Sequence, residues 1–159
     1  KNRSMSYLVT GGAGFIGSEI ALLLADLGIA VTQVEMLDRV MPRVLDVETA
    51  AYAERAMRER GIDLRLNTKA AEFRGRKMVE SLILENGEVL EADMFIAATG
   101  IRPNIDFLQD SGLPMAHGIL VDEHLNAGFP DIFAAGDVAE TMDLITGKRY
   151  VHALFPNAV

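Results

Sequence analysis

Residues 7–17 read Tyr7-Leu8-Val9-Thr10-Gly11-Gly12-Ala13-Gly14-Phe15-Ile16-Gly17, a run of β-forming residues followed by four glycines within seven positions. A helical pattern begins directly after Gly17. A strand, a glycine turn and a helix in this order form a phosphate cradle, because the helix directs its free N–H groups and positive dipole end at the anion. Gly12 allows the turn, Gly14 lets the backbone approach a pyrophosphate, and Gly17 lets the helix pack closely on the strand. The stretch therefore predicts a dinucleotide site.

The next residues extend this stretch into a strand–helix–strand unit. One apolar helix face, ended by Gly28, is predicted by the spacing of Ile16, Ile20, Leu23, Leu24 and Leu27. A second buried strand is expected over residues 29–34 and is followed by Glu35, 18 residues past Gly17. At about this spacing a carboxylate accepts hydrogen bonds from an adenosine ribose, although an acid can also simply end a strand. Arg39 and Arg43 are either phosphate contacts or solvated charges.

The remaining part of the first hundred residues predicts a second helix and a series of strands. The helix is expected over residues 49–60, and the strands over residues 64–73, 78–85, 88–91 and 93–99. Asn86-Gly87 indicates a type I′ hairpin turn. This order predicts the α/β class, with a Rossmann-like parallel sheet and a strand-meander insertion. Ligands bind outside the carboxyl ends of such strands, so Gly12 and Gly100 are expected to face one cofactor from two loops.

The sequence changes character after residue 104. A short helix or turn is expected over residues 106–112, and short strands over residues 118–122 and 131–135. The last of these strands leads into Gly136-Asp137, where the acid can bind a sugar or polyol hydroxyl or cap a helix. Residues 1–6 are expected to be disordered or a remnant added for expression.

Composition excludes several classes of function. The 159 residues carry a net charge of −8, which argues against nucleic-acid binding and against anionic membranes. Cysteine is absent, so this chain has no disulfides or thiolate metal sites, and no apolar run reaches the roughly 18 residues that a membrane span needs. The three histidines, at 117, 124 and 152, are well separated, and no metal site is predicted. The nucleotide site suggests a cytoplasmic location.

Four motifs taken together resemble class I pyridine nucleotide-disulfide oxidoreductases. They are the glycine stretch through Glu19, Glu35 with residues 38–43, Ala98-Thr99-Gly100-Ile101-Arg102-Pro103-Asn104, and Ile132-Phe133-Ala134-Ala135-Gly136-Asp137-Val138-Ala139. The chain is most similar to the branch of NADH oxidases, coenzyme A-disulfide reductases and rubredoxin reductases. Gly11 and Ala127 depart from the family pattern, which usually has an aliphatic residue and often a threonine at these positions.

The resemblance implies domains, cofactors and site residues. Residues 7–103 would form an NAD-binding domain and residues 104–159 part of an FAD-binding domain. The cofactor-binding residues implied are Gly12, Gly14, Phe15, Ile16, Gly17, Glu19, Glu35 and Gly100 for NAD, and Gly136 and Asp137 for FAD. No catalytic residue is assigned within the chain.

The function implied is the NAD(H)-binding portion of an FAD-dependent enzyme that passes hydride from NADH to flavin. FAD would be held only by the complete parent protein, which is expected to be a homo-oligomer, and the chain by itself is expected to be inactive. One alternative is a non-catalytic NAD-sensing module. Another is an extended short-chain dehydrogenase or epimerase, whose GxxGxxG spacing is met by Gly11, Gly14 and Gly17, although no Tyr-x-x-x-Lys pair is present.

Overall fold

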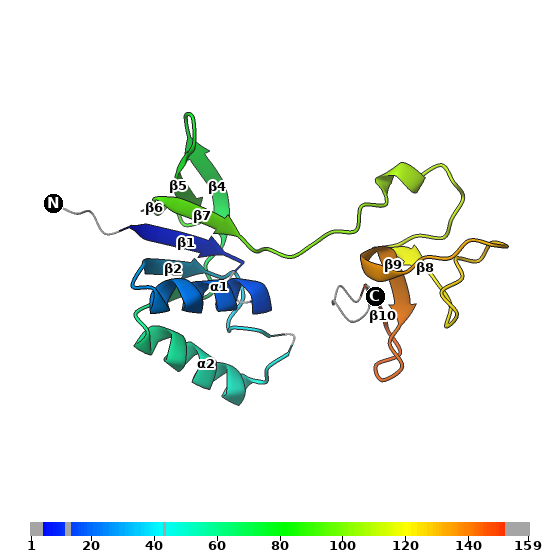
Figure 1. Ribbon diagram of the computed structural model, residues 1–159, viewed down its shortest axis with the longest axis horizontal. Helices are drawn as coiled ribbons and strands as arrows, with labels where there is room; N and C mark the ends of the chain where they lie inside the picture. Colours follow the sequence, from blue (N-terminus) through cyan, green and yellow to red (C-terminus); the bar gives the residue numbers. More distant parts are fainter. Residues whose placement is uncertain (1–4, 12–13, 43, 152–159) are drawn as a thin grey trace. The chain divides into compact units, whose positions relative to one another are not determined.

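The computed structural model describes residues 5–11, 14–42 and 44–151 (Figure 1). The chain divides into two compact units, the first ending at Gly100 and the second beginning at Ile101. Each unit is described by itself. Within the described residues no helix is long and apolar enough to cross a membrane.

A four-stranded parallel sheet forms the centre of the first unit. Its strands are β1 (Ser6–Thr10), β2 (Ala30–Val34), β3 (Asp63–Arg65) and β7 (Met94–Ala97), in the order β3-β2-β1-β7. Each neighbouring pair is parallel. The chain therefore moves from β1 outward on one side to β3 and later returns to the other side of β1 with β7. The α/β class and the parallel sheet predicted from the sequence are confirmed.

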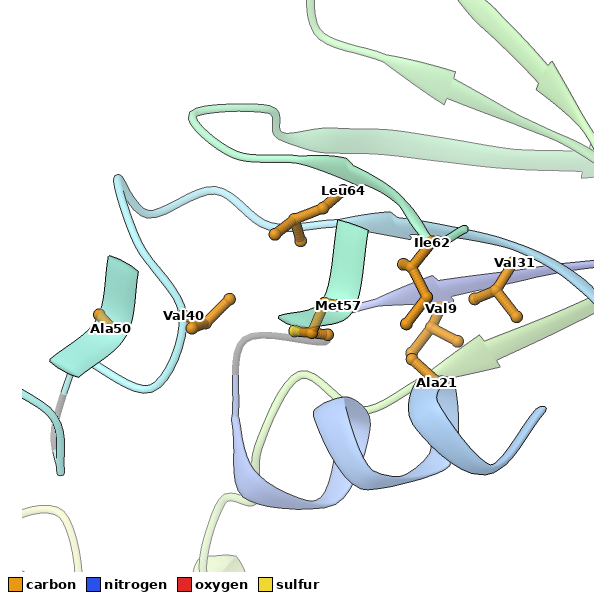
Figure 2. Packing of buried hydrophobic residues seen from close by; sticks show 8 residues of the cluster. All are labelled: Val9, Ala21, Val31, Val40, Ala50, Met57, Ile62 and Leu64. Carbon is orange, nitrogen blue, oxygen red and sulfur yellow. The ribbon is translucent and has the colours of Figure 1, made fainter. Parts of the chain in front are cut away.

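Two helices cover one face of this sheet, α1 (Phe15–Asp26) and α2 (Val47–Glu59) (Figure 1). Asp46 caps α2, because its carboxylate accepts a hydrogen bond from the Thr49 N–H at 2.7 Å, and this bond holds the pKa of Asp46 below its ordinary value. Gly61 follows α2 with φ of +81°. Figure 2 shows the buried core between helices and sheet, formed by Val9, Ala21, Val31, Val40, Ala50, Met57, Ile62 and Leu64.

The inward face of α1 differs from the apolar face predicted by its sequence. Its buried residues are Gly17, Ser18 and Ala21, whereas Ile16 and Leu23 are 68% and 54% exposed. Leu27, just beyond the helix, is 76% exposed. Small residues let the helix backbone approach the strand closely, and this close contact turns the larger side chains away from the sheet. The prediction from apolar spacing was therefore wrong for these three residues.

An antiparallel meander covers the opposite face of the parallel sheet. It consists of β4 (Ala70–Gly75), β5 (Val79–Leu84) and β6 (Val89–Glu91). Leu8 and Val34 of the parallel sheet share a buried cluster with Leu82 and Leu84 of β5. Because side chains alternate along a strand, β1 contributes Val9 to the helix side and Leu8 to the meander side. The predicted meander insertion is confirmed.

Two details of the predicted strands are corrected. The expected strand over residues 64–73 is two strands in two sheets, because Asn67 has φ of +50° and its N–H donates to the Leu37 carbonyl at 2.9 Å. The Asn86-Gly87 hairpin is not type I′, since Gly87 has positive φ and Asn86 does not. Gly87 N–H donates to the Leu84 carbonyl, and Leu84 N–H donates to the Glu88 carbonyl. This pattern is a three-residue hairpin with glycine at its left-handed position.

The second unit is built from short elements around a small core. They are η1 (Asp106–Leu108), β8 (Ile119–Leu120), η2 (Gly136–Val138), β9 (Ala139–Met142) and β10 (Arg149–Val151). The strand expected over residues 131–135 is absent from this described segment, which makes one isolated bridge, Asn126 to Phe133, and has φ of +63° at Asp131. Glu140 is buried in β9, where its Oε2 accepts the N–H groups of His117 at 2.8 Å and Gly118 at 2.9 Å.

Candidate functional site

The carboxyl ends of β1, β2 and β7 lie side by side at one edge of the parallel sheet. Thr10 at the end of β1 is in register with Val34 of β2 and with Ala97 of β7. The chain leaves β1 toward β2 but β7 lies on the other side of β1, so the direction of winding reverses between β1 and β7. Open α/β sheets bind ligands in the crevice at such a reversal. The fold thus brings the glycine turn, Glu35 and the Thr99-Gly100 loop to one edge.

The turn after β1 begins at Gly11, which has φ of +68°. Gly11 N–H donates to the Val34 carbonyl at 3.1 Å, so the turn is held to the end of β2. A Cβ at Gly11 would lie 2.6 Å from Thr99 Cα, which means that the turn lies against the loop after β7. From the sequence, Gly11 was a departure from the family pattern and a match to the GxxGxxG spacing of the alternative family, and no role in an NAD turn was predicted for it. Its turn role was signalled by the GxxGxxG spacing. Gly12, to which the turn was assigned, lies outside the described residues.

The start of α1 is open toward solvent at Gly14. Gly14 is the N-cap residue, is exposed, and has no side chain to accept hydrogen bonds from the first turn. Among the described residues, a Cβ at Gly14 would meet only the Gly11 carbonyl oxygen, at 3.7 Å. The first turn also has no acidic residue. An exposed helix start with no side-chain cap and no carboxylate in its first turn suits a bound anion.

The other α1 residues predicted for the site fall into two groups. Gly17 is buried against the sheet, in agreement with its packing role. Phe15, Ile16 and Glu19 are exposed. Glu19 lies just beyond the first turn of α1, so its side chain is placed one turn away from the Gly14 end of the helix.

Glu35 is a buried carboxylate at the end of β2. It is 6% exposed, and its Oε1 accepts the Leu37 N–H at 3.0 Å. The backbone of Glu35 is held on the β3 side, since its N–H donates to the Arg65 carbonyl and its carbonyl accepts the Thr68 N–H. The backbone N–H and the backbone carbonyl of Glu35 are therefore both hydrogen-bonded, and the residue is held at the same sheet edge as the glycine turn.

The remaining predicted site residues lie in different parts of the chain. Gly100 follows β7, is exposed and has φ of +101° with no atom within 4 Å of a Cβ placed on it. Gly136 and Asp137 belong to the second unit, where Gly136 begins η2 with φ of +77° and Asp137 is exposed in its first turn. Arg39 donates from Nη1 to Asp38 Oδ1 at 2.9 Å, and Arg43 lies outside the described residues.

Gln33, two residues before Glu35, was not predicted from the sequence as a site residue. Gln33 is 0% exposed, and neither Oε1 nor Nε2 has a hydrogen-bond partner. Its large polar side chain within a mostly apolar predicted strand, residues 29–34, was the available signal.

The other surface features are weaker candidates for a ligand site. A depression on α2 is lined by Glu48, Ala51, Tyr52 and Arg55, all from a single helix, which cannot enclose a ligand. In the described part of the chain no three His, Cys, Asp or Glu residues gather as metal ligands.

Comparison with known proteins places these features in one family. The family described as pyridine nucleotide-disulphide oxidoreductase matches residues 2–153. The chain is 36% identical to an NADH oxidase of Methanocaldococcus jannaschii over 139 residues, which covers 87% of this chain and 31% of that protein. It spans about a third of the length of the curated relatives that it matches.

Solved structures agree with this assignment. The putidaredoxin reductase–putidaredoxin complex contains a chain that is 31% identical, with a TM-score of 0.88 over 97% of this chain and 37% of that chain. The water-forming NADH oxidase of Lactobacillus brevis bound to NADH is 29% identical, with a TM-score of 0.86 over 99% of this chain and 34% of that chain.

Proposed function

The chain belongs to the pyridine nucleotide-disulphide oxidoreductase family, and on this premise we propose that it is the NAD(H)-binding portion of an FAD-dependent oxidoreductase. The parent enzyme would pass hydride from NADH to flavin. The nicotinamide supplies this hydride when it is bound, and the residues of this chain bind and orient it.

The observation that carries the proposal is the open helix start at the winding reversal of the sheet. Gly14, the exposed N-cap residue, places no side chain over the α1 N–H groups, and the turn is fixed to β2 through the Gly11 N–H. The pyrophosphate of NAD would accept hydrogen bonds from the N–H groups of this first turn. The solved relative bound to NADH is a protein of the same fold and supports the same ligand class.

Two acidic residues, Glu35 and Glu19, would lie near opposite ends of the cofactor. Glu35 is buried beside the turn and would accept hydrogen bonds from the adenosine ribose hydroxyls. Its charge would repel a 2′-phosphate, so NADH is the preferred cofactor. Glu19, exposed on α1 and near the turn in sequence, would lie toward the nicotinamide, and Gly100 along the same cofactor.

The second unit would contribute to the flavin side of the parent enzyme. Gly136 and Asp137 start η2, and the exposed Asp137 carboxylate can accept a hydroxyl of the flavin ribityl chain. A cytoplasmic location and a homo-oligomeric parent are part of the same proposal.

The test uses Gly14→Ala and calorimetric titration with NADH. The added methyl makes only an ordinary contact at 3.7 Å, and the backbone φ of −77° suits alanine, so the fold should lose at most about 1 kcal/mol. The same methyl occupies the space that the pyrophosphate needs. We expect NADH affinity to fall by roughly tenfold or more, which corresponds to about 1.4 kcal/mol.

Thermal unfolding of the same variant is the control for its fold. Wild-type protein that takes up no NADH at millimolar concentration would refute the proposal. A Gly14→Ala protein that binds NADH as wild type does would place the pyrophosphate elsewhere. If the complete parent binds NAD lastingly but never transfers hydride to flavin, the chain is an NAD-sensing module instead.

A further inference from the structure

Unpartnered buried polar atoms concentrate in one segment of the described chain. Three such side-chain atoms are present, Oε1 and Nε2 of Gln33 and Nε of Arg39, and all lie in β2 or the loop that follows it. Native proteins pair nearly all their buried polar groups, so each exception requires a physical reason. The Arg39 side chain is 29% exposed and can reach water by a small rotation. Gln33 is 0% exposed and cannot.

The surroundings of Gln33 explain why its amide has no partner. In the sheet it is in register with Val9 of β1 on one side and with Leu64 of β3 on the other. Both neighbours belong to the apolar core under the helices, together with Val31, which precedes Gln33 by two residues on β2. An apolar side chain of the same length would fill this place without leaving an amide unbonded. The amide therefore carries a stability cost that packing does not require.

Glu35 directly follows β2 and is the next residue toward its carboxyl end at the two-residue spacing of the strand face that carries Gln33. Residues two apart on a strand point to the same face, and their Cα atoms are about 6.6 Å apart. The backbone of Glu35 continues the bonding of β2, because its N–H donates to Arg65 on β3 at 2.9 Å. The spacing thus places the Gln33 amide and the Glu35 carboxylate as neighbours toward the carboxyl end of β2. A carboxylate accepts several hydrogen bonds at once, and the Leu37 N–H supplies one of them.

We propose that Gln33 is a positioning residue for Glu35 in the dinucleotide complex. When an adenosine ribose lies at this sheet edge, the Gln33 amide donates to the Glu35 carboxylate and fixes the orientation in which that carboxylate accepts the ribose hydroxyls. The inference rests on the proposed function and adds a second residue that determines cofactor choice. Polar groups that violate packing rules are typical of sites where function opposes stability.

The first experiment compares Gln33→Met with wild type. The variant should unfold at a higher temperature, because two unpaired atoms are removed. Its NADH affinity should fall by roughly tenfold, the loss expected for one hydrogen bond to a charged group, and its preference for NADH over NADPH should decrease. In a Glu35→Ala background, Gln33→Met should have no further effect on NADH affinity. Gln33→Leu serves if the methionine variant does not fold.

Failure of this inference is distinct from failure of the proposed function. A wild-type protein without NADH affinity refutes the proposed function. If wild type binds, Gly14→Ala is weakened and Gln33→Met binds both cofactors as wild type does, Gln33 is a purely structural residue and the inference is overturned. Equal effects of Gln33→Met with and without Glu35 would also overturn it.

A second measurement needs no substitution. The chain has only two glutamines, Gln33 and Gln109, so selective ¹⁵N labelling of glutamine gives two side-chain amide signals. Gln109 is exposed and has no role in the proposed site, so its signal serves as the internal reference. NADH should shift the Gln33 amide protons downfield and slow their exchange with solvent, while the Gln109 signals stay unchanged. An unshifted Gln33 signal at saturating NADH would overturn the inference.

Discussion

The contact between the glycine turn and the loop after β7 can be tested by adding one methyl group. In Gly11→Ala the new Cβ would lie 2.6 Å from Thr99 Cα and 2.8 Å from both the carbonyl carbon and the carbonyl oxygen of Ala98. Carbon atoms in favourable contact are about 3.5–4.0 Å apart, so the neighbouring loop must move by roughly 1 Å. All three atoms are backbone, and Ala98 N–H is itself bonded to the Thr10 carbonyl at 2.8 Å.

The expected loss of stability has two parts. Gly11 has φ of +68°, and the left-handed conformation costs an alanine about 1–2 kcal/mol. Crowding in a packed interior typically costs a further 1–3 kcal/mol. The free energy of unfolding should therefore fall by about 2–5 kcal/mol, a large part of the roughly 5–15 kcal/mol of a typical domain. Urea unfolding followed by far-UV circular dichroism measures this loss through the midpoint, provided the slope is unchanged.

A matched control separates the two parts. Gly61 has φ of +81° and no atom within 4 Å of an added Cβ, so Gly61→Ala carries the conformational cost without the crowding. Gly28, with φ of +77° and equally open surroundings, gives a second such control. If Gly11→Ala and Gly61→Ala lower the free energy of unfolding by the same amount, the glycine turn and the loop after β7 are not in contact. The arrangement of these two loops at the carboxyl ends of β1 and β7 would then be wrong.

Two further predictions concern single carboxylates. Wild-type protein should bind NADH roughly ten- to a hundredfold more tightly than NADPH. Parallel titrations of Glu35→Gln should show that most of this preference is lost. Equal affinities of wild type for the two cofactors would refute the role of Glu35. The N–H groups of Asn126 and His124 hold the pKa of Asp122 below its ordinary value of 3.8. The contribution of the Asp122 carboxylate to stability is therefore present above pH 3.8 and is lost as the pH falls through the lowered pKa. The unfolding free energies of wild type and Asp122→Asn should therefore converge in acid. A constant difference between them across that pH range would contradict this prediction.

Local sequence determined the parts of the fold that depend on neighbouring residues. The β1–glycine–α1 unit, the second helix with its end at Gly61, and the alternation of elements that implies a parallel sheet all follow from short-range spacing and backbone preference. The family was likewise recognisable from four short motifs. These features rest on residues a few positions apart, whose backbone geometry depends on their immediate neighbours and not on distant parts of the chain.

Tertiary structure decided the features in which distant residues compete for the same space. Spacing marked Ile16, Leu23 and Leu27 as inward, but the inward face of α1 is set by how closely Gly17 and Ala21 let the helix approach β1. The break at Asn67 arises from its bond to Leu37 on another segment, and the demand for glycine at position 11 comes from the β7 loop. The missing partner of Gln33 follows from Val9 and Leu64, which only the sheet register places beside it. Each outcome depends on contacts between residues far apart in the chain, and a local pattern contains no information about such contacts.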